Sequence, residues 1–172
     1  MLLLTMLIAA TAAGSTAPFS ANPLANAEKS LLQCYRPNVQ DKTCQSIASY
    51  RRTGPGTYDN KALVPVSGDV TLETHTPVVI KGEAVCGSVR REDILQGTLR
   101  AGNQIIPAEK AKPILDRIAQ AMAPLFDKEI CTTYEKAGAD FTAKASIDGH
   151  YSPDLDQTVK WIGPAEGYTV KP

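Results

Sequence analysis

The segment TYDNKALVPVSGDVTLETHTPVVIKGEAVCGSV, residues 57–89, is rich in Val, Thr and Ile and is divided by turn-forming residues. The turn formers are Asp59-Asn60, Ser67-Gly68-Asp69 and Lys81-Gly82. β-branched residues between such turns indicate short strands joined mostly as hairpins. Val70 and Leu72 alternate with polar neighbours, as expected of an antiparallel strand with one buried face. We therefore predict three or four strands here.

A long helix is predicted on the C-terminal side, after a helical turn at residues 91–96 and a strand pair at residues 98–106. Apolar residues recur there at three- and four-residue steps and form one stripe. They are Ala111, Ile114, Leu115, Ile118, Met122, Leu125, Phe126, Ile130 and Tyr134. Pro124 predicts either a kink or two consecutive helices, and Gly138 suits the position after the last helical residue.

The two ends of the chain complete the predicted fold. A short N-terminal helical hairpin is expected from residues 27–33 and 41–51, separated by Pro37. Strands are expected in the tail, at residues 140–148, 158–162 and 168–171. The fold class predicted is α+β, with an antiparallel β-sheet packed on one long helix in the C-terminal half, straight or kinked at a proline.

Residues 2–13 are apolar, and the first charged residue is Glu28. This apolar run is shorter than the ~20 residues that span a bilayer, but it has the length of a signal-peptide core. Ala25-Asn26-Ala27 resembles a cleavage site, although no Lys or Arg precedes the core. We predict a signal peptide at residues 1–27 and one domain at residues 28–172. The alternatives are cleavage after Ala17 and a buried first helix.

Charge and cysteine content limit the compartment and the partners. The chain has 18 basic and 18 acidic side chains, so no basic footprint for nucleic acid is present. Four cysteines in an exported chain favour two disulfides, in a periplasmic or secreted protein. Cys34–Cys44 is the favoured local pair, because residues 36–38 look like a turn. Cys86–Cys131 then follows and would join a strand to the long helix.

The sequence offers few residues for catalysis or metal binding. It has two histidines, His75 and His150, and neither belongs to a zinc-binding motif, so no metal site or cofactor is expected. The loop at residues 148–156 is rich in carboxylates but does not follow the calcium-binding loop pattern. Local signatures of serine hydrolases and phosphate-binding loops are also missing.

We therefore expect a non-catalytic binding or interaction module whose partner is a protein or a small ligand, with no integral membrane segment once the signal is removed. Aromatic residues in the β-rich parts, Tyr58, Tyr151, Trp161 and Tyr168, could line a ligand face, although core packing is the stronger interpretation of Trp161. The alternative is a small secreted hydrolase. Its catalytic residues would be His150 with a nearby carboxylate from Asp148, Asp154 or Asp156.

Overall fold

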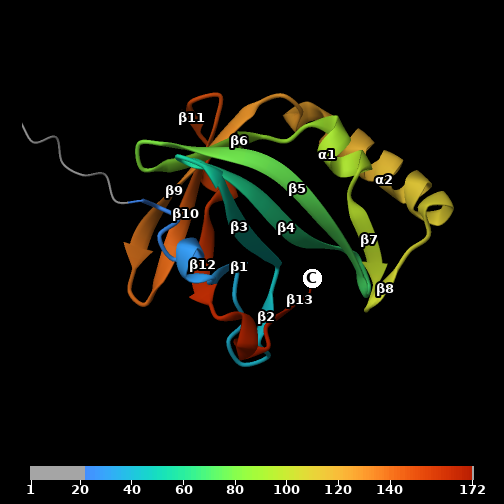
Figure 1. Ribbon diagram of the computed structural model, residues 1–172, viewed down its shortest axis with the longest axis horizontal. Coiled ribbons are helices and arrows are strands. Elements are labelled where there is room, and N and C mark those ends of the chain that lie inside the picture. Colours follow the sequence, from blue (N-terminus) through green and yellow to red (C-terminus); the bar gives the residue numbers. More distant parts are fainter. Residues whose placement is uncertain (1–21, 172) are drawn as a thin grey trace, which may run out of the picture.

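The computed structural model describes residues 22–171, and most of the predicted signal segment lies outside them. Eight antiparallel strands form a closed barrel in the order β4-β3-β1-β12-β10-β9-β6-β5, and β5 pairs back onto β4 (Figure 1). The barrel strands are β1 (Leu32–Tyr35), β3 (Ser46–Gly54), β4 (Thr57–Ser67), β5 (Val70–Lys81), β6 (Ala84–Ser88), β9 (Glu129–Ala137), β10 (Asp140–Ile147) and β12 (Gln157–Ile162).

The remaining elements lie around the barrel. They are a 3-10 turn η1 (Ala27–Lys29), β2 (Thr43–Cys44), α1 (Arg91–Leu95), β7 (Thr98–Ala101), β8 (Gln104–Ile105), α2 (Ala108–Met122), η2 (Ala123–Leu125), β11 (His150–Tyr151), η3 (Pro153–Leu155), η4 (Pro164–Glu166) and β13 (Thr169–Val170). Figure 1 shows α1 and α2 together on the side of β5 and β7. No helix in residues 22–171 is long and apolar enough to cross a membrane.

The predicted α+β fold, a sheet packed on one long helix, is wrong. The helix ends at Met122; Leu125 lies in η2, Phe126 follows it, and the last two residues of the supposed apolar stripe lie in β9. Ile130 and Tyr134 are four residues apart, a spacing that fits one face of a helix and also one face of a strand. The β-branched Thr132 between them faces the same side, and Thr favours a strand. Pairing of β9 with both β6 and β10 decides the conformation.

The predicted N-terminal helical hairpin is also wrong. Residues 27–33 contain the single turn η1 and the start of β1, and residues 41–51 contain β2 and most of β3. Cys44, Ile47 and Tyr50 are spaced like one face of a helix. The side chains of β3 nevertheless alternate at a period of two, and the strand is held between β1 and β4.

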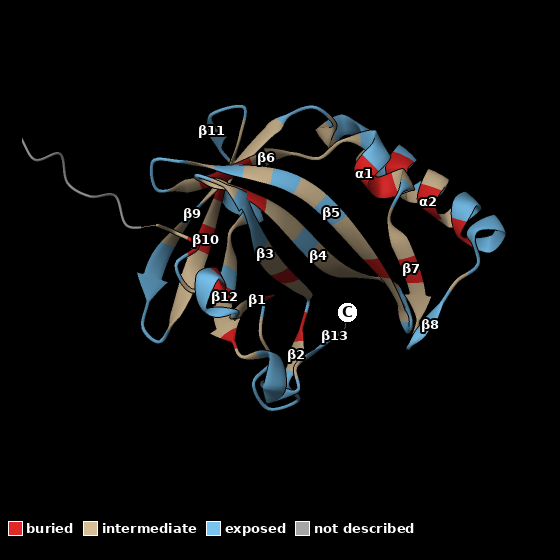
Figure 2. Ribbon diagram, in the orientation of Figure 1, coloured by how far each residue is buried: buried red, intermediate tan, exposed pale blue. Residues whose placement is uncertain are grey.

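Several predictions are confirmed. Residues 57–89 form β4, β5 and β6, joined as hairpins, and the helical turn at 91–96 and the strand pair at 98–106 are α1 and β7–β8. The predicted turn at Asp59-Asn60 is wrong, because both residues lie inside β4 and pair with β3 and β5. The tail strands correspond to β10, β12 and β13. In Figure 2 buried and exposed residues alternate along α2, and its apolar side packs with α1, β5 and β7.

Both predicted disulfides are present. Cys34 on β1 is bonded to Cys44 on β2, and Cys86 to Cys131. The second bond joins directly opposite residues of the neighbouring strands β6 and β9, and not a strand to a helix. Two disulfides and no free cysteine in the described residues indicate an oxidising, extracellular environment.

Candidate functional site

The barrel encloses a cavity of about 510 Å³. Its walls come from β1, β3, β4, β5, β6 and β9, and α1 and α2 add Ile94, Ile118 and Met122. Eight strands leave an interior that side chains can fill or that can hold one small ligand. Cavities of ~300–1,000 Å³ are the usual size of small-molecule sites. The interior of this barrel therefore has room for a ligand.

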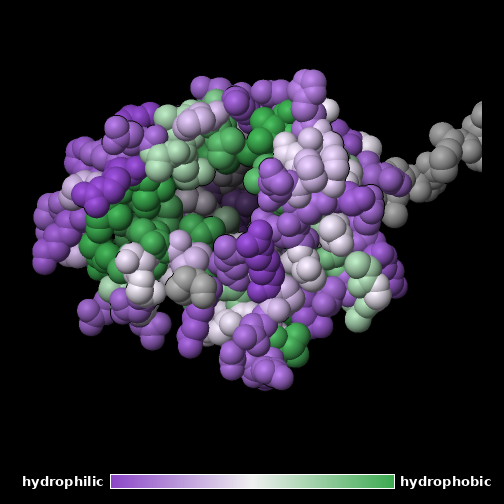
Figure 3. Space-filling model, turned by 180° about the vertical axis from the view of Figure 1, so that it is seen from behind, coloured by the Kyte–Doolittle hydropathy of each residue, from purple (hydrophilic) through white to green (hydrophobic). Residues whose placement is uncertain are grey.

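Small side chains keep this interior open. Ala62 and Thr74 are opposite each other on β4 and β5, and both line the cavity with Thr132 of β9. These positions face inward, where large side chains would fill a barrel of this size. Figure 3 shows a hollow on the face behind the view of Figure 1, with hydrophobic residues gathered beside it.

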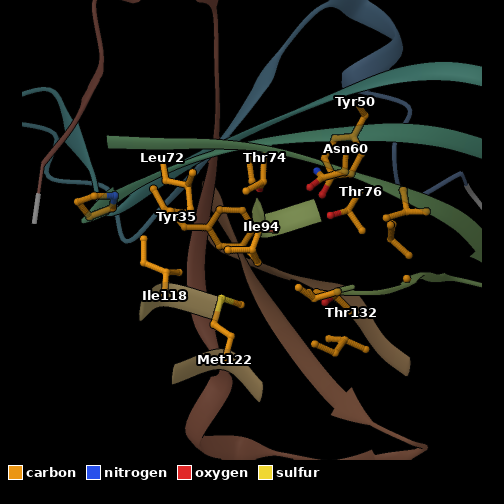
Figure 4. A pocket seen from close by; sticks show the side chains of 18 of the residues that line it. Tyr35, Tyr50, Asn60, Leu72, Thr74, Thr76, Ile94, Ile118, Met122 and Thr132 are labelled. Atoms are coloured by element: carbon orange, nitrogen blue, oxygen red, sulfur yellow. The ribbon is translucent and has the colours of Figure 1, made fainter. Parts of the chain in front are cut away.

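Among residues 22–171, the cavity lining contains no charged residue and no histidine. Most of it is aliphatic, and the polar groups are three tyrosine hydroxyls, the amide of Asn60 and the hydroxyls of three threonines. Tyr50, Asn60 and Thr76 are opposite one another across β3, β4 and β5. They lie together on one side of the cavity in Figure 4, with Met122 on the other. The site is thus a hydrophobic cavity whose main polar side is formed by Tyr50, Asn60 and Thr76, with Thr132 of β9 apart from them.

Behind this polar side, three tyrosines surround a buried glutamine. The Oε1 atom of Gln33 accepts hydrogen bonds from Tyr35 and Tyr50, both at 2.9 Å, and from Tyr134 at 3.3 Å. Tyr35 and Tyr134 hydroxyls are 3.2 Å apart. Burial, followed by the neighbouring tyrosines, raises the pKa of Tyr35 and of Tyr50 well above 10. These hydroxyls therefore stay protonated at physiological pH.

The segment before β1 packs against the barrel near these tyrosines. Leu24 is fully buried and, with Ala27, forms a cluster with Tyr58 and Val85. The hydroxyl of Tyr58 donates to Glu28 Oε1 at 2.8 Å. Asn22 Nδ2 donates to Glu28 Oε1 and to the hydroxyl oxygen of Tyr58, each at 3.2 Å. Tyr50 and Tyr134 pack on this cluster as well, so the segment helps to hold the polar side in place.

The residues predicted for a hydrolase are not gathered into a site. His150 is exposed on β11, and Asp148 and Asp154 are exposed beside it. Asp148 Oδ1 accepts a hydrogen bond from the backbone N–H of Glu129. Asp156 accepts one from the Tyr151 hydroxyl at 2.6 Å. None of the four predicted catalytic residues lines the barrel cavity.

The second histidine lies outside the barrel. His75 Nδ1 is 3.0 Å from Asp59 Oδ2, and its Nε2 is 3.7 Å from Glu73 Oε1. His75 is exposed, and the two half-buried carboxylates also pair with Arg51 and Lys61 in a row of surface ion pairs. In residues 22–171 no group of His, Cys, Asp or Glu is arranged to hold a metal ion.

Sequence reasoning missed the residues of the cavity. Gln33 and Tyr50 were assigned to helices, which hides their position on inward faces of β1 and β3. The alternation of Ala48 and Tyr50 was the available signal. Among the predicted aromatic residues, Tyr58 belongs to the buried core, Trp161 and Tyr168 are partly buried and pack against core clusters, and Tyr151 is exposed.

Comparison with protein-family models, with curated proteins and with solved structures finds no match to this chain.

Proposed function

We propose that the protein is an exported, non-catalytic binding module that holds a small molecule inside its barrel. The observation that carries this proposal is the cavity of about 510 Å³, which is lined by aliphatic residues and a few convergent polar groups. A sizeable apolar cavity with few polar groups is the typical form of a small-molecule site. Export is supported by the two disulfides and by the apolar run at residues 2–13.

A binding role fits the lining better than catalysis. General acid–base chemistry needs a titratable group within hydrogen-bond reach of the substrate. Within residues 22–171 the only titratable side chains of the lining are tyrosines, and the raised pKa of Tyr35 and Tyr50 keeps both protonated at physiological pH, so neither is available as a general base. His150 stands outside the cavity on an exposed hairpin.

The proposal is tested by titrating the disulfide-bonded protein with Nile red, an uncharged fluorescent probe. We expect saturable binding of one probe per chain with a blue-shifted emission. Ala62→Phe adds a ring at an inward position and should reduce probe affinity at least tenfold. Ala137→Phe adds the same ring at an exposed position of β9 and should leave affinity unchanged.

Thermal unfolding of both variants verifies that they fold. Absence of saturable binding to the wild-type protein would overturn the proposal. So would equal binding by wild type and a folded Ala62→Phe variant, because the probe would then occupy the outer surface.

A further inference from the structure

Gln33, Tyr35, Tyr50 and Tyr134 form a hydrogen-bonded group, here named the tyrosine cluster. The hydrogen bonds that this cluster can still make indicate the chemical class of the ligand. This step rests on the proposed function. Gln33 is fully buried, and its Oε1 atom is the common acceptor of the three hydroxyls. Within residues 22–171 its Nε2 atom has no hydrogen-bond partner. The network is therefore incomplete, and buried polar networks are seldom left so.

Counting protons and lone pairs shows what the tyrosine cluster offers to a ligand. A carbonyl oxygen has two lone pairs, and the two shortest bonds, from Tyr35 and Tyr50, occupy them. The oxygen of Tyr50 donates its own proton to Gln33 and keeps lone pairs that can accept a hydrogen bond from a ligand. Tyr134 makes the two longest contacts of the cluster, 3.3 Å to Gln33 Oε1 and 3.2 Å to the Tyr35 hydroxyl, so its proton is the one most easily redirected to a ligand. The cluster thus presents an acceptor and a donor, and one hydroxyl group can satisfy both.

Within residues 22–171 the cavity lining carries no charge, which disfavours a ligand whose charged group lies inside the cavity. A carboxylate or ammonium group brought into this cavity would lose its water without meeting an opposite charge, at a large free-energy cost. A tyrosinate could pair with a cation, but burial keeps Tyr35 and Tyr50 protonated. The lining consequently selects an uncharged molecule.

The position of the polar groups sets the orientation of the ligand. Tyr50, Asn60 and Thr76 form the polar side, whereas Ile118 and Met122 of α2 are on the other side of the cavity (Figure 4). We propose that the ligand is an uncharged alcohol, with its hydroxyl group bound at the tyrosine cluster and its apolar body directed toward α2. An aldehyde or ketone of the same shape can accept a hydrogen bond but cannot donate one, so it leaves the lone pairs of the Tyr50 oxygen without a donor.

The test compares four molecules with one ten-carbon body: 1-decanol, decanal, decanoate and decylamine. Each is used to displace Nile red from the disulfide-bonded wild-type protein at pH 7. We expect 1-decanol to displace the probe at concentrations at least tenfold lower than decanoate or decylamine, and several-fold lower than decanal. Equal potency of the four, or stronger displacement by the acid, amine or aldehyde, would overturn the alcohol assignment while leaving probe binding, and so the proposed function, in place.

Two variants test whether the tyrosine cluster causes the preference for 1-decanol over decanal. Tyr50→Phe removes one hydroxyl, and the preference for 1-decanol over decanal should fall to near unity. Tyr151→Phe removes an exposed hydroxyl and should keep the wild-type ratio. An unchanged ratio in folded Tyr50→Phe would overturn the placement of the hydroxyl group. If neither the probe nor any of the four molecules binds wild type, both the assignment and the proposed function fail.

Discussion

Leu24 allows a quantitative test of how the segment before β1 contributes to the barrel. Its side chain is fully buried against Tyr58 and Val85. Replacing a buried leucine by alanine typically costs about 2–5 kcal/mol, depending on how far the site can collapse. Because Leu24 is on a terminal segment that can adjust, we expect the lower half, about 2–3 kcal/mol. For a domain of this size that lowers Tm by roughly 5–10 °C.

The assay is urea and thermal unfolding of residues 18–172, with the disulfides intact, for wild type and Leu24→Ala. Val39→Ala is the matched control, because Val39 is 58% exposed and its truncation should change stability by less than about 0.5 kcal/mol. A Leu24→Ala variant as stable as wild type would refute the reasoning that this segment is docked.

The same variant separates the two cleavage sites predicted from sequence. Cleavage after Ala27 would remove Leu24, so the exported forms of wild type and Leu24→Ala would be identical and equally stable. Cleavage after Ala17 would keep Leu24 and the stability difference. The burial of Leu24 favours the second outcome, and N-terminal sequencing of the exported protein checks it.

The other predictions concern the disulfides and pH. In the chain-entropy model, removing Cys86–Cys131, with a sequence separation of 45, should lower the free energy of unfolding by about 4 kcal/mol. Removing Cys34–Cys44, with a separation of 10, should lower it by about 3 kcal/mol. Urea unfolding of the paired alanine variants measures both losses, and equal losses would contradict this order. The raised pKa of Tyr50 means that the folded chain keeps a proton that the unfolded chain loses near pH ~10, so wild-type stability should fall as pH rises from about 10 toward the folded pKa. Tyr50→Phe should lose less stability between pH 9 and pH 11, and parallel losses would count against the burial of this hydroxyl.

Local patterns predicted the hairpins but not the barrel. Turn formers and alternation located β4, β5 and β6, because these strands pair with their neighbours in sequence. Closure depends on pairs far apart in the chain, such as β1 with β12 and β6 with β9. No local pattern encodes those pairs, and the cavity exists only after they have formed.

The helix and strand periods overlap at a spacing of four residues, which explains the largest error. Ile130 and Tyr134 fit the stripe that begins at Ala111, although Met122 is the last residue of α2. The disulfides were predictable because cysteine pairing needs only an even count and a plausible turn. The roles of Gln33 and Tyr50 depend on which barrel face they occupy, and that required the strand register.

The most direct test of the central claim locates a bound molecule by NMR. With isotope-labelled protein and 1-decanol, we expect intermolecular NOEs from the alkyl chain to the methyl groups of Leu72, Ile118 and Met122, which line the cavity. NOEs confined to exposed residues such as Val39 and Ile105, with none inside the barrel, would contradict it.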